Sequence, residues 1–228
     1  MRRTSRTNRL ATPARAELQL EGLEARDVPA SFVSFTGATY SQNFDNLGTS
    51  TVTNLISPGV QYLDEAPVSV SSLNGWSIHR LGGTTGSGPY PLTVGTGSVN
   101  AGGAYNFATA VAPSDRSLGT LLSGAFAANF GIVLRNNSAS PITQLDVTYN
   151  SEQYRRGGGS GTEDRLDFQY QLGVADISPT TGWINLGVLN ATSVNVSNSA
   201  VSSIDGNAAG RLARSATIDF SPGSWGVG

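Results

Sequence analysis

The fold class is set by residues 145–150, Leu-Asp-Val-Thr-Tyr-Asn, in which apolar and polar side chains alternate. Because successive side chains of a β-strand point to opposite faces, this period of two predicts a strand with one apolar and one hydrated face. The same period recurs in residues 166–172, where Phe168 falls on the apolar face, and in residues 216–220. No stretch carries a convincing apolar period of 3.6 residues, so the sequence predicts an all-β chain.

Shorter patterns predict further strands outside these stretches. They cover residues 31–35, 40–48, 75–80, 104–108, 130–134 and 184–188, while the apolar run 118–122 is ambiguous. Turns rich in Gly and Asn join them, which is typical of an antiparallel β-sandwich, and we expect its jelly-roll version. The Gly-rich residues 157–161 are interpreted as a long hairpin loop between strands 145–152 and 166–172. One domain is therefore expected over residues 31–228.

Composition excludes several kinds of chemistry. The 228-residue chain has no Cys, and all 14 of its basic residues are Arg. Disulfides, thiolate metal sites, Lys Schiff bases and Lys-dependent phosphate loops are thereby excluded. His79 is the only imidazole, so the chain has no pair of histidines for a zinc site. No apolar run is long enough for a transmembrane segment.

Residues 1–30 form a basic head. Its first sixteen residues hold five arginines and no acid: Arg2, Arg3, Arg6, Arg9 and Arg15. The apolar core of a classical secretory signal peptide is missing, and composition alone predicts a disordered basic tail. A nucleic-acid partner is not expected, because residues 31–228 hold twelve acids against eight arginines and would repel phosphate.

Residues 23–30, Leu-Glu-Ala-Arg-Asp-Val-Pro-Ala, form a recognisable short motif at the end of the head. They resemble the LE-x-R-x-hydrophobic-P-A (LEPR-like) element that follows an Arg-rich head in secreted proteins of planctomycete-type bacteria. Ala25 stands where that element often has Asp or Pro. The resemblance implies export and an extracellular or cell-surface location, and it implies no activity.

A second resemblance covers much of the body. The order QNFDNLG, GW, GAYNFAT, SDRSLGTLLSG, FGIVLRNNSASPITQLDVTYNSEQYR, DRLDFQYQLG and GWINL is similar to a bacterial extracellular β-sandwich module. In longer relatives such modules stand beside nuclease, lamin-tail-like or sorting domains. The module implies a final strand with LRW-x-D and GLAIDD-like elements, and residues 221–228 end where that strand would begin. The resemblance therefore implies a domain truncated by its last strand.

Two groups of acids are candidates for chemistry. Glu152 and Asp167 would face each other if the hairpin across residues 157–161 forms, and two carboxylates are the minimum for glycoside hydrolysis. Both fall on polar faces, where acids are normally solvated, so we expect no catalytic residue. Glu163, Asp164 and Asp167 could supply oxygens to a calcium ion, the one cofactor considered; the alternative is a charged loop end.

Residues Glu152, Tyr154 and Arg155 form the candidate ligand site. They resemble the module's EQWR element, with Tyr154 where Trp is frequent. An aromatic ring can stack on a sugar while Arg and Gln supply hydrogen bonds. The alternative, which we favour, is that Tyr154 caps the core and Arg155 pairs with an acid such as Glu152 or Asp164.

These observations indicate a non-catalytic extracellular or cell-surface β-sandwich module for attachment, matrix structure or carbohydrate contact. Its partner would be an extracellular glycan or a surface matrix. The alternative is an accessory fragment of a secreted hydrolase, of nuclease or glycosidase type, whose catalytic part is missing. Geometry separates these functions: an enzyme needs convergent acids in a deep cleft, whereas a binding module needs a shallow groove lined by Tyr154 or a Trp.

Overall fold

The computed structural model describes residues 31–56, 59–82, 89–157, 161, 163–196 and 201–228. The predictions on the basic head, 1–30, and on most of the Gly-rich loop lie outside these residues. Within the described residues the regular structure is strands and three short 3-10 helices, so the all-β prediction is confirmed. The strands form small sheets that do not close on themselves.

The N-terminal half contains most of the buried core. Its strands are β1 (Val33–Phe35), β2 (Val52–Ile56), β3 (Gly59–Tyr62), β4 (Trp76–Gly82), β5 (Tyr90–Gly95), β6 (Gly103–Phe107), β7 (Ser117–Leu121), β8 (Ala127–Ile132) and β9 (Leu134–Asn136), with helices η1 (Asp45–Leu47) and η2 (Ser71–Leu73). They pair in the orders β2-β5-β6-β7, β3-β4-β8 and β1-β9. The apolar side chains between them form one cluster: Leu47, Leu63, Leu73, Ile78, Leu92, Ala104, Leu118 and Phe126. We call this half the core layer.

The C-terminal half is built on one long ribbon. Strands β10 (Gln144–Glu152) and β17 (Arg211–Asp219) pair antiparallel in an unbroken register of nine residue pairs. Side chains on one face are partly or fully buried, and those on the other face are exposed. This alternation is the pattern that predicted the two strands.

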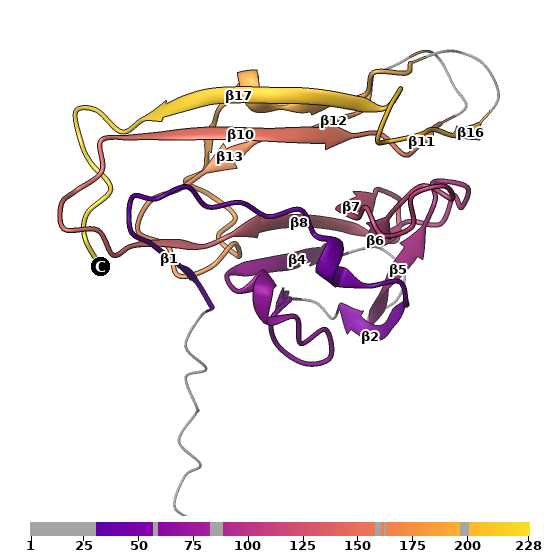
Figure 1. Cartoon of the computed structure of the whole chain (residues 1–228), viewed down its shortest axis with the longest axis horizontal. Coiled ribbons are helices and arrows are strands. Elements are labelled where there is room, and N and C mark those ends of the chain that lie inside the picture. The colour runs from indigo at the N-terminus through magenta and orange to yellow at the C-terminus, as the bar shows by residue number, and fades with distance from the viewer. Residues whose placement is uncertain (1–30, 57–58, 83–88, 158–160, 162, 197–200) are drawn as a thin grey trace, which may run out of the picture.

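Short elements accompany this ribbon. They are β11 (Arg155–Arg156), β12 (Arg165–Leu166), β13 (Gln169–Tyr170), β14 (Ile184–Asn185), η3 (Gly187–Leu189), β15 (Ala191–Thr192) and β16 (Ser202–Ser203). Helix η3 packs against β17, and β15 packs against β10. We call the ribbon and these elements the ribbon layer; Figure 1 shows it above the core layer, with β17 along the outer rim.

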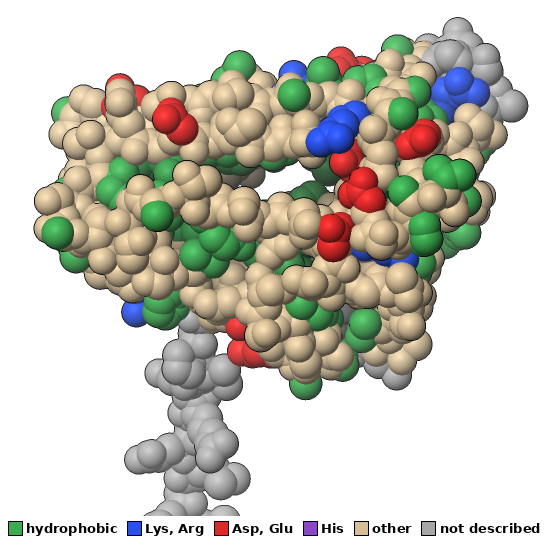
Figure 2. All heavy atoms as spheres, viewed as in Figure 1, with side chains coloured by type: hydrophobic (Ala, Val, Ile, Leu, Met, Phe, Trp, Pro, Cys, Tyr) green, Lys and Arg blue, Asp and Glu red, His purple; other side chains and the backbone are tan. Residues whose placement is uncertain are grey.

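The two layers meet at their ends and separate between them. Figure 2 shows an opening through the molecule between the layers, with acidic side chains beside one end of it. At one end of the ribbon Trp225 stacks on Phe35 of β1, and at the other Tyr154 stacks on Phe107 of β6. Aromatic contacts at two points therefore join the layers.

Three expectations about strands and pairing are wrong. Residues 40–48 form no strand: η1 begins after Phe44, whose φ of 64° is left-handed. The hairpin across residues 157–161 does not form, because β10 pairs with β17, while β12 and β13 pair with β15 and β14. Two pairs, β1-β9 and β5-β6, are parallel rather than antiparallel. A period of two fixes which face of a strand is apolar, but it does not choose the partner strand.

Candidate functional site

The predicted ligand residues lie where the chain leaves β10 and enters β11. The four side chains of residues 152–155 each contact a different part of the molecule. Gln153, for example, accepts hydrogen bonds from the backbone N–H groups of Val194 (3.0 Å) and Asn195 (2.8 Å) through its Oε1. We call residues 152–155 the clasp.

Tyr154 is the buried centre of the clasp. Its side chain is 3% exposed, and its ring stacks on Phe107 with centroids 4.9 Å apart, while Phe107 stacks on Tyr105 at 4.9 Å. Its hydroxyl donates to Glu152 Oε2 (2.8 Å) or to Asn207 Oδ1 (3.1 Å). Burial raises the pKa of Tyr154 above its usual value, and the hydrogen bond to Glu152 adds to the rise. The favoured interpretation of Tyr154 as a core residue is confirmed.

Glycines let the backbone close around Tyr154. A Cβ at Gly97, where φ is +79°, would stand 1.7 Å from the Tyr154 carbonyl oxygen, and one at Gly206 would stand 2.6 Å from its ring. Only Gly tolerates both that φ and that approach. The clasp is thus packed on three segments that are distant in sequence, those of Gly97, Phe107 and Gly206.

The other two clasp residues also bond internally. Glu152 accepts a hydrogen bond from the Ser117 hydroxyl, and Arg155 donates to the carbonyl oxygens of Gly97 (2.9 Å) and Ser98 (3.2 Å). The expectation that Arg155 pairs with Glu152 or Asp164 is wrong, because its guanidinium donates to backbone carbonyls and forms no ion pair with a described acid. A ligand-binding role for Glu152, Tyr154 and Arg155 stays a prediction, while the described contacts are those of a joint between layers.

The predicted calcium ligands do not converge. Asp167 forms an ion pair with Arg165 (2.6 Å) and accepts a hydrogen bond from Asn190 Nδ2 (3.1 Å). Glu163 and Asp164 are exposed. In the described part of the chain no group of three or more His, Cys, Asp or Glu residues is arranged to hold a metal ion. Calcium binding stays a prediction.

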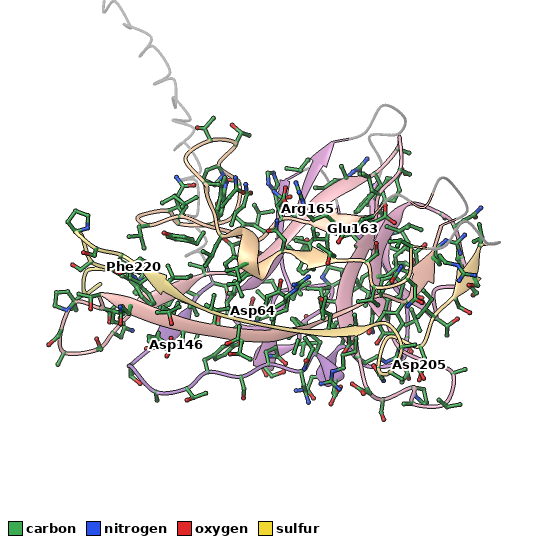
Figure 3. The ribbon with its side chains drawn as sticks, turned by 90° about the horizontal axis from the view of Figure 1, so that it is seen from above. Asp64, Asp146, Glu163, Arg165, Asp205 and Phe220 are labelled. Carbon is green, nitrogen blue, oxygen red and sulfur yellow. The ribbon has the colours of Figure 1, made fainter. Side chains whose placement is uncertain are left out.

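The acids labelled in Figure 3 also lie apart from one another. Asp64, Asp146, Glu163 and Asp205 come from different parts of the chain, and Figure 3 shows them at separate places. The predicted pair of Glu152 and Asp167 lacks the shared hairpin that would have brought the two carboxylates together.

A groove of about 640 Å³ lies at the other end of the ribbon. It is lined by residues of β1 and its approach, of β9, of the turn after β13 and of the C-terminal segment: Phe32, Val133, Leu134, Arg135, Leu172, Gly173, Val174, Ala175 and residues 224–228. Trp225 and Phe32 supply its aromatic rings, and Arg135 its one charged side chain. We call it the Trp225 groove.

The walls of the Trp225 groove are held in place. Trp225 pairs with Ile142 through two backbone hydrogen bonds (2.8 and 3.0 Å), and its ring stacks on Phe35 with centroids 5.6 Å apart. Asn136, fully buried, donates to the Trp225 carbonyl (3.0 Å). The Arg135 guanidinium lies 3.8 Å above the centre of the Phe32 ring. An aromatic wall and a cation are therefore fixed before any ligand arrives.

Sequence reasoning missed this groove. Trp225 lies in residues 221–228, which the module resemblance predicts to be a truncated tail. Phe32 lies 193 positions earlier, so no local pattern joins the two residues. The one available signal was a Trp in a segment that is otherwise rich in Gly and Ser, residues 221–228.

The Trp225 groove offers unused hydrogen-bond donors. Among the described residues, none accepts a hydrogen bond from the Arg135 guanidinium or from the Trp225 indole N–H. Arg carries five N–H groups and indole one, so the groove can bind oxygen acceptors beside an apolar surface.

The chain matches no protein-family model, no curated protein and no solved structure. Within the residues that the structure describes, no helix is long and apolar enough to span a membrane.

Proposed function

We propose that this chain is a non-catalytic β module of the cell surface or extracellular space, and that it attaches to a carbohydrate through the Trp225 groove. The observation that carries the proposal is the groove itself: two aromatic rings, an Arg without an acid partner among the described residues, and an open mouth. Sugar rings stack on aromatic faces while their hydroxyls accept hydrogen bonds from Arg and indole N–H groups.

The clasp also supports the proposal, because its side chains are engaged in internal contacts. Its Tyr154 ring is buried and its Glu152 carboxylate accepts internal hydrogen bonds, so the polar groups that best resembled a catalytic or sugar-binding set hold the layers together. The exposed face of the β10–β17 ribbon carries no aromatic side chain. The Trp225 groove is then the described surface that best fits a shallow binding site. The β-sandwich, in its jelly-roll version, remains our expected architecture for the module.

Binding of oligosaccharides to the full chain tests the proposal. We would titrate wild type and the Arg135→Ala variant with a panel of neutral and acidic oligosaccharides by calorimetry. Arg135 is exposed, so the substitution should leave folding intact and weaken binding about tenfold or more through the lost charged hydrogen bonds. Arg165→Ala is the matched control, since Arg165 is also an exposed arginine but pairs with Asp167 outside the groove.

Trp225→Phe gives a second, independent measure. It keeps an aromatic ring against Phe35 and removes the indole N–H, so it should weaken binding while the melting temperature changes little. If no oligosaccharide binds wild type, or if Arg135→Ala binds as well as wild type, the carbohydrate-binding role of the groove is wrong.

A further inference from the structure

The outer edge of β17 has no strand beside it among the described residues. Strand β17 pairs with β10 alone, and Figure 1 shows it along the rim of the molecule. A nine-residue edge with unpaired backbone groups is a template for another strand. Natural edges are usually protected by Pro, charged side chains or a bulge; β17 contains no Pro and no bulge, and its charged residues are Arg211, Arg214 and Asp219.

The direction of each backbone group on β17 follows from its ladder with β10. Just beyond the ends of the ribbon, Phe220 N–H donates to the Thr143 carbonyl and Gln153 N–H donates to the Gly210 carbonyl. Bonded pairs alternate along an antiparallel ladder, so the even-numbered residues of β17 bond to β10. The N–H and C=O groups of the odd-numbered residues point away from β10, toward the free edge.

The sequence of β17 is self-complementary when two copies run antiparallel about Ser215. In that register Arg211 faces Asp219 of the second copy, and Leu212 faces Ile218. Ala213 faces Thr217, and the two Ser215 residues face each other. Opposite charges therefore meet at both ends, and apolar side chains meet on the buried side.

This register is also the one that the backbone requires. Odd-numbered residues face odd-numbered residues, so their outward N–H and C=O groups meet and can form about eight hydrogen bonds. The estimate leaves out the Arg211 N–H, which donates to Ala208 O (3.2 Å). A shift by one residue would place outward groups against inward ones and would turn the apolar side chains to the wrong face.

We propose that two copies of this chain join edge to edge through β17 in an antiparallel, two-fold symmetric pair, forming a continuous sheet in the order β10-β17-β17-β10. A two-fold axis through the Ser215 pair makes both contacts identical, as isologous dimers require. Val188 of η3, the helix that packs against β17, is 59% exposed in the single chain and lies on the side of the ribbon where Leu212 and Ile218 pair.

The outer edge of β10 fits a second copy less well. The same operation about Thr148 would place Gln144 against Glu152 and Asp146 against Asn150, with no opposite charges. On β17, the inward Arg214 faces Ala216 of the second copy, and its guanidinium is already held by Thr192 Oγ1 of its own chain (2.7 Å). The charge pattern thus selects the β17 edge.

Sedimentation velocity of the full chain, up to about 1 mM, tests the dimer, since small interfaces can be weak. Ser215→Pro removes an outward N–H at the centre of the contact and should leave a monomer. Thr148→Pro is the matched control: it lies on the same rung, loses the same Thr148–Ser215 hydroxyl contact (3.0 Å), and places its proline on the opposite edge. We expect this control to dimerise like wild type.

A charge exchange decides the register even if a proline variant fails to fold. Arg211→Asp alone and Asp219→Arg alone each place like charges at both ends of the pair, so each should dimerise roughly tenfold to thirtyfold more weakly. An equimolar mixture of the two variants restores opposite charges at both ends and should form a heterodimer. A monomeric wild type, equal effects of the two prolines, or a mixture that stays monomeric would overturn the proposal.

Discussion

The core layer and the ribbon layer bury their apolar residues very differently. In the core layer Leu63, Leu73, Ile78 and Phe126 are fully buried. In the ribbon layer Leu189 and Ile218 are also buried, but Leu166, Leu172, Ile184 and Val188 are at least 42% exposed. The layer whose sequence showed the clearer pattern is therefore the one with the thinner core.

This contrast follows from what an alternation of apolar and polar residues indicates about a strand. Alternation marks a strand with one face in water, as in β10 and β17. Strands buried deeper alternate less, because neighbouring positions can both be covered. The most regular pattern thus identified the half-hydrated ribbon, and the less regular β5, β6 and β7 contribute Leu92, Ala104 and Leu118 to the core.

Truncating one Phe in each layer should give the largest difference. Phe126→Ala removes a fully buried ring packed 5.0 Å from Tyr90, and it should cost about 3–5 kcal/mol of unfolding free energy. Phe168→Ala removes a partly buried ring, 6.2 Å from Tyr149, and should cost only about 1–2 kcal/mol. Urea unfolding measures both; equal losses would mean that the two layers are equally well packed.

A methyl group in the joint between the layers should have the next largest effect. Gly97→Ala places a Cβ 1.7 Å from the Tyr154 carbonyl oxygen at a φ of +79°, and it should cost roughly 2–3 kcal/mol more than its control. The control is Gly37→Ala, which has a similar φ of +89° and open space around it, and should cost about 1 kcal/mol. Similar melting temperatures for the two variants would show that the clasp does not hold the layers.

Removing the Tyr154 hydroxyl should have the smallest effect and the clearest pH signature. Tyr154→Phe should cost about 1–2 kcal/mol at neutral pH, because Glu152 and Asn207 lose a buried partner. The pKa of Tyr154 is raised in the folded protein, so folding favours the protonated form. Its contribution is complete below the unfolded value of 10.0 and is lost as pH rises above it.

Denaturant unfolding between about pH 8 and 11 checks this prediction. Wild type should lose more stability than Tyr154→Phe as pH rises above 10.0. Burial also raises the pKa values of Tyr62, Tyr105 and Tyr149, so part of the loss should remain in the variant. Parallel pH profiles for the two proteins would contradict the buried position of this hydroxyl.

The sequence was sufficient for the all-β class and for several strand positions, including β4, β6 and β10. It predicted only the second half of β17 and did not predict β2, β3 or β5. It was insufficient for pairing, because β10 and β17 lie about sixty residues apart and local alternation does not reveal distant partners. The segment 165–172 shows the limit most clearly. Its alternation is regular, but it breaks into two short strands with different partners.

Of the two candidate sites, the clasp was predictable from the sequence and the Trp225 groove was not. Tyr154 stands in a recognisable motif, and weighing core against ligand was enough to favour the core. The Trp225 groove forms where Phe32, Arg135 and Trp225 come together from three distant segments. No local sequence pattern predicts that these segments are neighbours.

Both ends of the described chain lie on the Trp225 groove, since Phe32 and Gly228 line it together. Gly228 N–H also donates to the Asn136 carbonyl (2.8 Å), which fixes that end beside β9. Chains whose ends meet tolerate circular permutation, so residues 31 and 228 can be joined by a short linker and new ends opened in an exposed turn such as Pro113–Ser114. In such a permutant β7 to β17 would be synthesised before β1 to β6, so the ribbon layer would emerge from the ribosome between the two parts of the core layer.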